Sequence, residues 1–136
     1  MSPLKLSLIA SVLCLLTITA FAQDYQPYPS PKITQEQWAR YGETVRQMYG
    51  DSLEVFKDKH LVAFADLGTR TFWLFTMKDH PAHPAWITRQ MYEESGVVRV
   101  RQIGYFAGKE EEFAKLFAEY LKRNEELKKD VERRNR

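Results

Sequence analysis

The sequence predicts an α+β fold: a four-stranded antiparallel meander with N- and C-terminal helices packed on one face of the sheet (α-β-β-β-β-α). Changes in hydrophobic period indicate this order. Apolar residues recur at helical spacing in residues 35–49, follow strand patterns in residues 61–106, and return to helical spacing after Gly108. The connections between the strand-like segments are short, which favours antiparallel neighbours.

Residues 1–22 are predicted to be a secretory signal peptide. A short basic opening precedes an apolar run, and Ala20-Phe21-Ala22 matches the A-x-A cleavage pattern. The run is too short for a stable membrane span, so we expect an exported protein, periplasmic or secreted, with no membrane span after cleavage. Cys14, the only cysteine of the chain, would leave with this segment, and the exported protein would have no disulfide.

Residues 23–33 are predicted to be an extended leader, because they contain three prolines and two tyrosines. A single α+β domain is expected over residues 34–136. It begins with a capping box, in which the Thr34 hydroxyl accepts from the amide of Gln37 and the Gln37 side chain reaches back. Helical spacing then predicts the first helix over residues 35–49.

Four strands are expected after an ambiguous segment at residues 51–60. Alternation and the abundance of strand-forming residues place them at residues 61–66, 71–77, 85–92 and 97–106. The second helix is expected from Lys109, with glutamates in its first turn, where the helix dipole favours negative charge. The charged tail that follows is expected to be a helix that frays into solvent.

One side of the third and fourth strands combines aromatic and basic residues. An even-length turn at residues 93–96 would bring two sets of alternating residues to the same side: Trp86, Thr88, Gln90, Tyr92, Arg99, Arg101, Ile103 and Tyr105. The opposite side holds Ile87, Met91, Val98 and Val100, a credible core face on which Arg89 is an exception. We expect the first side to be left uncovered by the helices. The candidate binding residues, for a protein or an anionic cell-envelope component, are Trp86, Arg99, Arg101 and Tyr105. The alternative is an ordinary exposed sheet face, where tyrosine and arginine are common.

The connection MKDHPAHPAW carries two histidines, His80 and His83, each followed by proline. In polyproline-like backbone, residues three apart point the same way, so the pair could bind copper or zinc. It supplies only two ligands, and His60 would have to join from the start of the first strand. A stiff corner, in which a histidine caps a strand end, explains the pattern better. A metal-binding or metal-responsive protein is the alternative function, and no other cofactor is expected.

The sequence lacks the residue patterns of common enzyme sites. The exported chain would have no cysteine nucleophile, its serines have no elbow-type glycine pattern around them, and no Gly-rich phosphate loop, CxxC or HExxH motif is present. A formal net charge of +2 shows no basic excess typical of a general nucleic-acid binder. We therefore expect a small, exported, non-enzymatic binding module.

Overall fold

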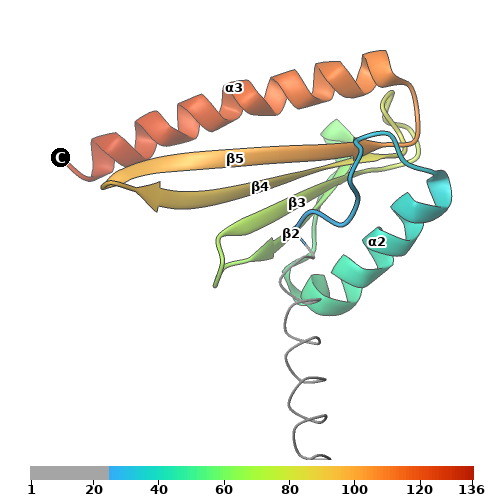
Figure 1. The fold of residues 1–136 in the computed structure, drawn as a ribbon, viewed down its shortest axis with the longest axis horizontal. Coiled ribbons are helices and arrows are strands. Elements are labelled where there is room, and N and C mark those ends of the chain that lie inside the picture. Colours follow the sequence, from blue (N-terminus) through green and yellow to red (C-terminus); the bar gives the residue numbers. More distant parts are fainter. Residues whose placement is uncertain (1–24) are drawn as a thin grey trace, which may run out of the picture.

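The structure is a computed structural model that describes residues 25–136, so the predicted signal peptide and its cleavage site lie outside the described residues. Five antiparallel strands form one sheet in the order β1-β2-β3-β4-β5. One helix precedes the strands and another follows them (Figure 1). The predicted α+β class and the meander order are confirmed, but the sheet has one strand more than predicted.

The first helix, α2 (Gln35–Tyr49), has the predicted bounds and the predicted capping box. The amide of Gln37 donates to the Thr34 hydroxyl at 3.1 Å, and the amide of Thr34 donates to the Gln37 side chain at 2.9 Å. The leader before it is tied to the last strand, since the amide of Ile33 donates to the Phe106 carbonyl at 2.9 Å. This contact holds the start of α2 beside one end of the sheet.

The additional strand is β1 (Glu54–Phe56), which pairs antiparallel with β2. It lies in the segment that the sequence left ambiguous, between two short 3-10 turns, η1 (Gly50–Ser52) and η2 (Lys57–Lys59). All three of its residues are exposed. A strand this short, with neither face buried, shows no alternation of apolar and polar residues, so the hydrophobic pattern could not reveal it.

The other strands lie close to their predicted positions and end in a long hairpin. They are β2 (Leu61–Asp66), β3 (Thr71–Thr76), β4 (Ala85–Glu94) and β5 (Val97–Phe106). The strands β4 and β5 pair along their full length, whereas β3 pairs only with the first part of β4. The hairpin therefore extends beyond β3 as a two-stranded arm. Its turn is Ser95-Gly96, with φ of 54° and 79°, which is the left-handed region used in tight hairpin turns.

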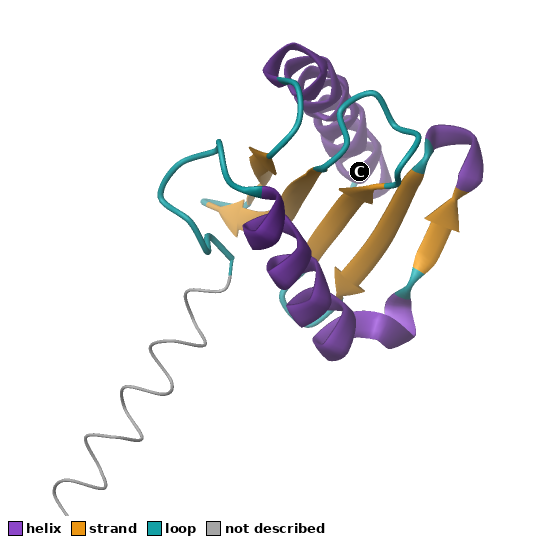
Figure 2. Cartoon of the chain, turned by 90° about the vertical axis from the view of Figure 1, so that its right-hand side faces the viewer, coloured by secondary structure: helices purple, strands orange, loops and turns teal. Residues whose placement is uncertain are grey.

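The two helices pack on opposite faces of the sheet, so the prediction that both lie on one face is wrong (Figure 2). On one face, Tyr41 and Val45 of α2 pack in a cluster with Phe64, Trp73, Phe75 and Trp86. On the other, Phe113, Leu116 and Tyr120 of α3 (Glu110–Arg134) pack in a cluster with Leu61, Leu74, Ile87 and Phe106. The central strands carry large apolar residues at both odd and even positions, so each face needs its own cover.

The second helix continues without a break through the charged tail to Arg134. It runs along β5 for most of the length of the hairpin (Figure 1). Within residues 25–136, neither helix combines the length and the apolar character needed to cross a membrane.

Candidate binding surface on the β4–β5 arm

The four candidate binding residues lie on one face of the sheet, as predicted. The register pairs Trp86 with Tyr105 and Tyr92 with Arg99, and Gln90 faces Arg101 between them. The turn contains two residues, an even number, which is the condition for this arrangement. The candidates nevertheless divide into a covered end and an open end.

Trp86 and Tyr105 are buried, so the expectation that they are exposed is wrong. Trp86 is 0% exposed and Tyr105 is 3% exposed. The ring of Tyr41 from α2 stacks on Trp86 with centroids 4.4 Å apart, and the Tyr105 hydroxyl donates to the Tyr28 carbonyl of the leader at 2.8 Å. Because α2 and the leader cover this end, neither residue can touch a partner directly, and both belong to the core.

The open end of the same face is basic and aromatic. Arg99 and Arg101 are exposed, and Tyr92 is half-buried beside them. The guanidinium of Arg101 lies over the ring of Tyr92 at 4.6 Å and over the ring of Tyr25 at 5.8 Å. Both distances are within the range of cation–π attraction. We call Tyr25, Tyr92, Arg99 and Arg101 the arginine–tyrosine surface.

Sequence reasoning missed Tyr25 because this residue belongs to the leader. Its only signal was the aromatic composition of that segment, and nothing in a proline-rich stretch indicates which strand it will meet. The structure places its ring against Arg101, far away in the sequence. Residues from two separate parts of the chain therefore build the surface.

The charges of Arg99 and Arg101 are poorly neutralised. No carboxylate of residues 25–136 forms an ion pair with Arg101. Arg99 contacts Glu94 with 3.8 Å between Nε and Oε1, and both side chains are exposed. Exposed pairs of this kind contribute little, about 0–1 kcal/mol. Both guanidinium groups can therefore accept a new anionic partner.

Tyr25 is held neutral at the edge of this surface. Burial raises the pKa of Tyr25 to about 12, while the charge of Arg101 opposes the shift. Its hydroxyl is buried and has no hydrogen-bond partner among the described residues. Tyr25 therefore acts on Arg101 through its ring, as a neutral aromatic group.

His83 is fixed at the end of β3 by its ring contacts. Its Nδ1 lies 2.9 Å from the Thr76 hydroxyl and 3.2 Å from the Thr76 carbonyl oxygen. The ring also meets Trp38 edge-on, with centroids 5.0 Å apart. The peptide bond between His83 and Pro84 is cis. These contacts support the interpretation of this loop as a structural corner that caps a strand end.

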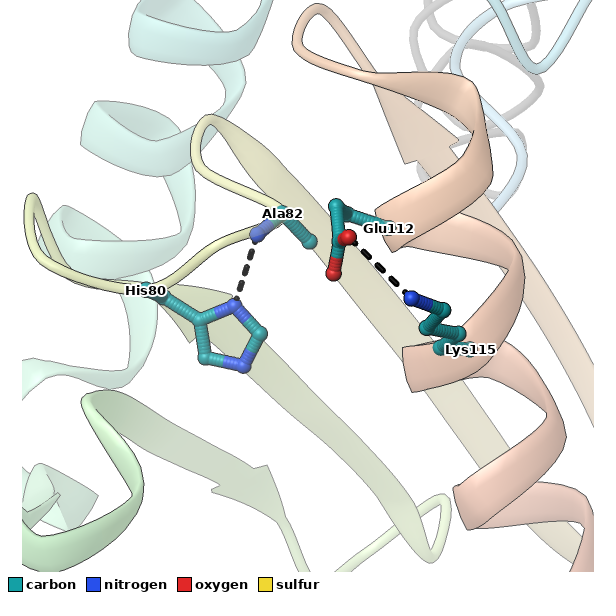
Figure 3. Close-up of polar contacts among 4 residues, drawn as sticks. All are labelled: His80, Ala82, Glu112 and Lys115. Atoms are coloured by element: carbon teal, nitrogen blue, oxygen red, sulfur yellow. Dashed lines mark hydrogen bonds and ion pairs between the residues drawn. The ribbon is translucent and has the colours of Figure 1, made fainter.

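His80 turns back on its own loop. Its Nδ1 accepts a hydrogen bond from the amide of Ala82 at 3.0 Å, as Figure 3 shows next to the Glu112–Lys115 ion pair of α3. Burial lowers the pKa of both His80 and His83, so both rings are neutral at pH 7. Among residues 25–136, no group of three or more histidine, cysteine or acidic side chains is placed to hold a metal ion.

The structure explains why an arginine, Arg89, lies on the apolar side of the sheet. Its Nε donates to Oδ1 of Asn124 on α3 at 2.6 Å, and its guanidinium lies over the Tyr120 ring at 5.3 Å. An arginine on a core-facing position is therefore anchored by the helix that covers that face. The sequence pattern did not indicate this contact, because Arg89 and Asn124 are 35 positions apart and meet only through the packing of α3 on the sheet.

Comparisons with family models, with curated proteins and with solved structures find no match to this chain. No residue role can therefore be transferred from a relative. The contacts, burial and charges described above are the basis for assigning a function.

Proposed function

We propose that this chain is an exported, non-enzymatic binding module that uses the arginine–tyrosine surface to bind an acidic segment of a protein partner. The observation that carries the proposal is the environment of Arg101. Its exposed guanidinium lies against two tyrosine rings and has no carboxylate partner among residues 25–136.

The physical basis is preorganisation. An arginine that already rests on aromatic rings loses less side-chain freedom when it binds than an arginine free in solvent. Its planar fork of donors matches a carboxylate, with two parallel hydrogen bonds. Tyrosine and arginine are also among the residues most enriched at the centres of protein interfaces. A second arginine, Arg99, lies two positions away on the same face and adds positive charge.

The test is capture of a partner by the exported protein from an envelope extract, compared with capture by the double variant Arg99→Glu/Arg101→Glu. We expect the variant to lose the partner, because like charges would then face the acidic segment. Its melting temperature should change by only a few degrees, since exposed substitutions shift stability by about 0.5 kcal/mol or less. Mass spectrometry then identifies the captured protein.

A matched control is Lys122→Glu/Lys129→Glu, which makes the same charge change at two exposed lysines of α3. This variant should capture the partner normally. If the arginine variant folds and still captures the partner, the site lies elsewhere. If wild type retains only an anionic envelope polymer and no protein, the partner class is wrong although the surface is right.

A further inference from the structure

A groove lies on the opposite face of the sheet, between α3 and the parts of β2 and β3 that α3 does not cover. Because α3 packs mainly along β5, it covers the same face of β2 and β3 only in part (Figure 1). The groove has a volume of about 610 Å³, within the range typical of small-molecule sites. Its floor, formed by the sheet, is apolar and includes Ala63, Phe72, Leu74, Met91 and Val100, and Leu127 of α3 adds an apolar side chain at its side.

Arg89 is the cation that lies on the sheet side of this groove. A chain of hydrogen bonds positions it: Asn124 accepts from Arg89, then donates through Nδ2 to Oε1 of Gln102 at 2.8 Å. The Gln102 Nε2 in turn donates to the Phe117 carbonyl at 3.0 Å. Only Nε of Arg89 takes part, so the terminal nitrogens of its guanidinium have no hydrogen-bond or ion-pair partner among residues 25–136.

A second arginine, Arg123, lies beside Arg89 and forms an ion pair with Glu119, with 3.2 Å between Nη2 and Oε1. Arg123 lies over the same Tyr120 ring at 5.3 Å, and its Nε is buried without a partner in the described part of the chain. Burial lowers the pKa of Arg89, and the charge of Arg123 lowers it further, although Tyr120 opposes the shift. An anion placed beside Arg89 would offset these effects, because a nearby opposite charge favours the charged guanidinium.

The rim of the groove limits which anions can enter. Besides one lysine, Lys59, it carries three carboxylates, those of Glu54, Glu126 and Asp130. A ligand with many negative charges, such as a nucleic acid or a strongly acidic peptide, would meet these carboxylates. A ligand with one anionic head and an apolar body would place the head at Arg89 and the body on the floor.

We propose that this groove binds a long-chain carboxylate, with the acyl chain on the apolar floor and the carboxylate on the free guanidinium nitrogens of Arg89. This site is additional to the arginine–tyrosine surface, which lies on the other face of the sheet. The two proposals can therefore fail independently.

The test uses the exported protein with ¹³C-labelled methionine methyl groups and dodecanoate as the probe. Met91 lines the groove, whereas Met48 and Met77 do not. Dodecanoate should shift the Met91 methyl signal saturably and leave the other two unchanged. Dodecanol, which has the same chain without the charge, should bind at least about tenfold more weakly, because it lacks the charge-assisted hydrogen bonds. Acetate, which has no chain, should not bind at concentrations up to about 1 mM.

The protein variants are Arg89→Gln and, as a matched control on the opposite face, Arg99→Gln. The first should weaken dodecanoate binding at least about tenfold without affecting dodecanol, and the second should change neither. An unmoved Met91 signal, or equal binding of dodecanoate and dodecanol to wild type, would overturn the proposal. If Arg89→Gln does not fold, the affinities of wild type for dodecanoate and dodecanol still test the proposal. A Met91 signal that moves with protein concentration alone would instead show that a second copy covers the groove.

Discussion

Replacing Gly104 by alanine should weaken the packing of α3 against the sheet and destabilise the fold. Gly104 lies in β5 directly beneath the helix, and an added Cβ would stand 2.6 Å from Cζ of Phe113 and 3.1 Å from Cδ2 of Phe117. The Phe113 ring cannot easily retreat, because it is 8% exposed and stacks on Phe106 with centroids 4.9 Å apart. The helix must therefore shift or the ring must leave its preferred rotamer.

The expected cost is that of an overpacked core, about 1–3 kcal/mol. For a domain of this size, that corresponds to a melting temperature lowered by roughly 4–15 °C. Thermal unfolding followed by circular dichroism, with urea unfolding alongside, measures both quantities. Adding Phe113→Leu to Gly104→Ala should recover part of the loss, because the smaller side chain makes room for the methyl group; the two substitutions would then be non-additive.

Gly50→Ala is the matched control. Gly50 has φ of −58° and ψ of −29°, and a Cβ there would meet nothing within 4 Å. Alanine should leave stability unchanged or raise it by about 0.4–1 kcal/mol, because it restricts the unfolded chain. If Gly104→Ala proves as stable as wild type, the close packing of Phe113 over β5 is not as described and the reasoning is refuted.

Three further predictions concern other parts of the chain. Thr76→Val should cost about 1–3 kcal/mol in urea unfolding, because the Thr76 hydroxyl accepts from the buried amide of Ala85 at 2.9 Å and valine cannot; an unchanged midpoint would contradict this role. Burial raises the pKa of Tyr25 to about 12 and Arg101 opposes it, so Arg101→Gln should raise this pKa further in an ultraviolet titration referenced to Tyr25→Phe. The pKa of Tyr25 in the unfolded chain is about 10. The contribution of neutral Tyr25 to the free energy of unfolding is therefore complete below pH 10 and is lost as the pH rises through about 12. Intact mass spectrometry of the exported protein should show a chain that begins at Gln23, and a retained segment 1–22 would contradict the predicted processing.

Local patterns predicted the elements of this fold better than their arrangement. The capping box at Thr34 located the start of α2, and alternation in β4 and β5 correctly placed Tyr92 and Arg99 on the same face of the sheet. These features depend on neighbouring residues and on the geometry of one turn. The side of the sheet on which each helix packs depends on contacts between segments that are far apart in the sequence. Local hydrophobic patterns do not indicate these contacts.

The errors at the candidate site share this origin. Trp86 is a residue type that is common at binding surfaces, but α2 packs over that end of the sheet and buries it. Tyr25 joins the surface only because the leader returns to β5. Arg89 looked anomalous until Asn124, 35 positions later, was placed beside it. In each case a residue type could be read from the sequence, whereas its environment depended on packing.

The two edges of the sheet differ in how they discourage aggregation. At one edge, β1 contains three residues and is flanked by 3-10 turns, which makes it too short to template another strand. At the other edge, the leader pairs with the backbone of Phe106, but no segment of residues 25–136 pairs with the outer edge of the far part of β5. Arg99 and Arg101 lie along that open part, so two copies aligned edge to edge would bring like charges together. The arginines that we assign to partner binding thus also protect the protein from joining its sheet to that of a second copy.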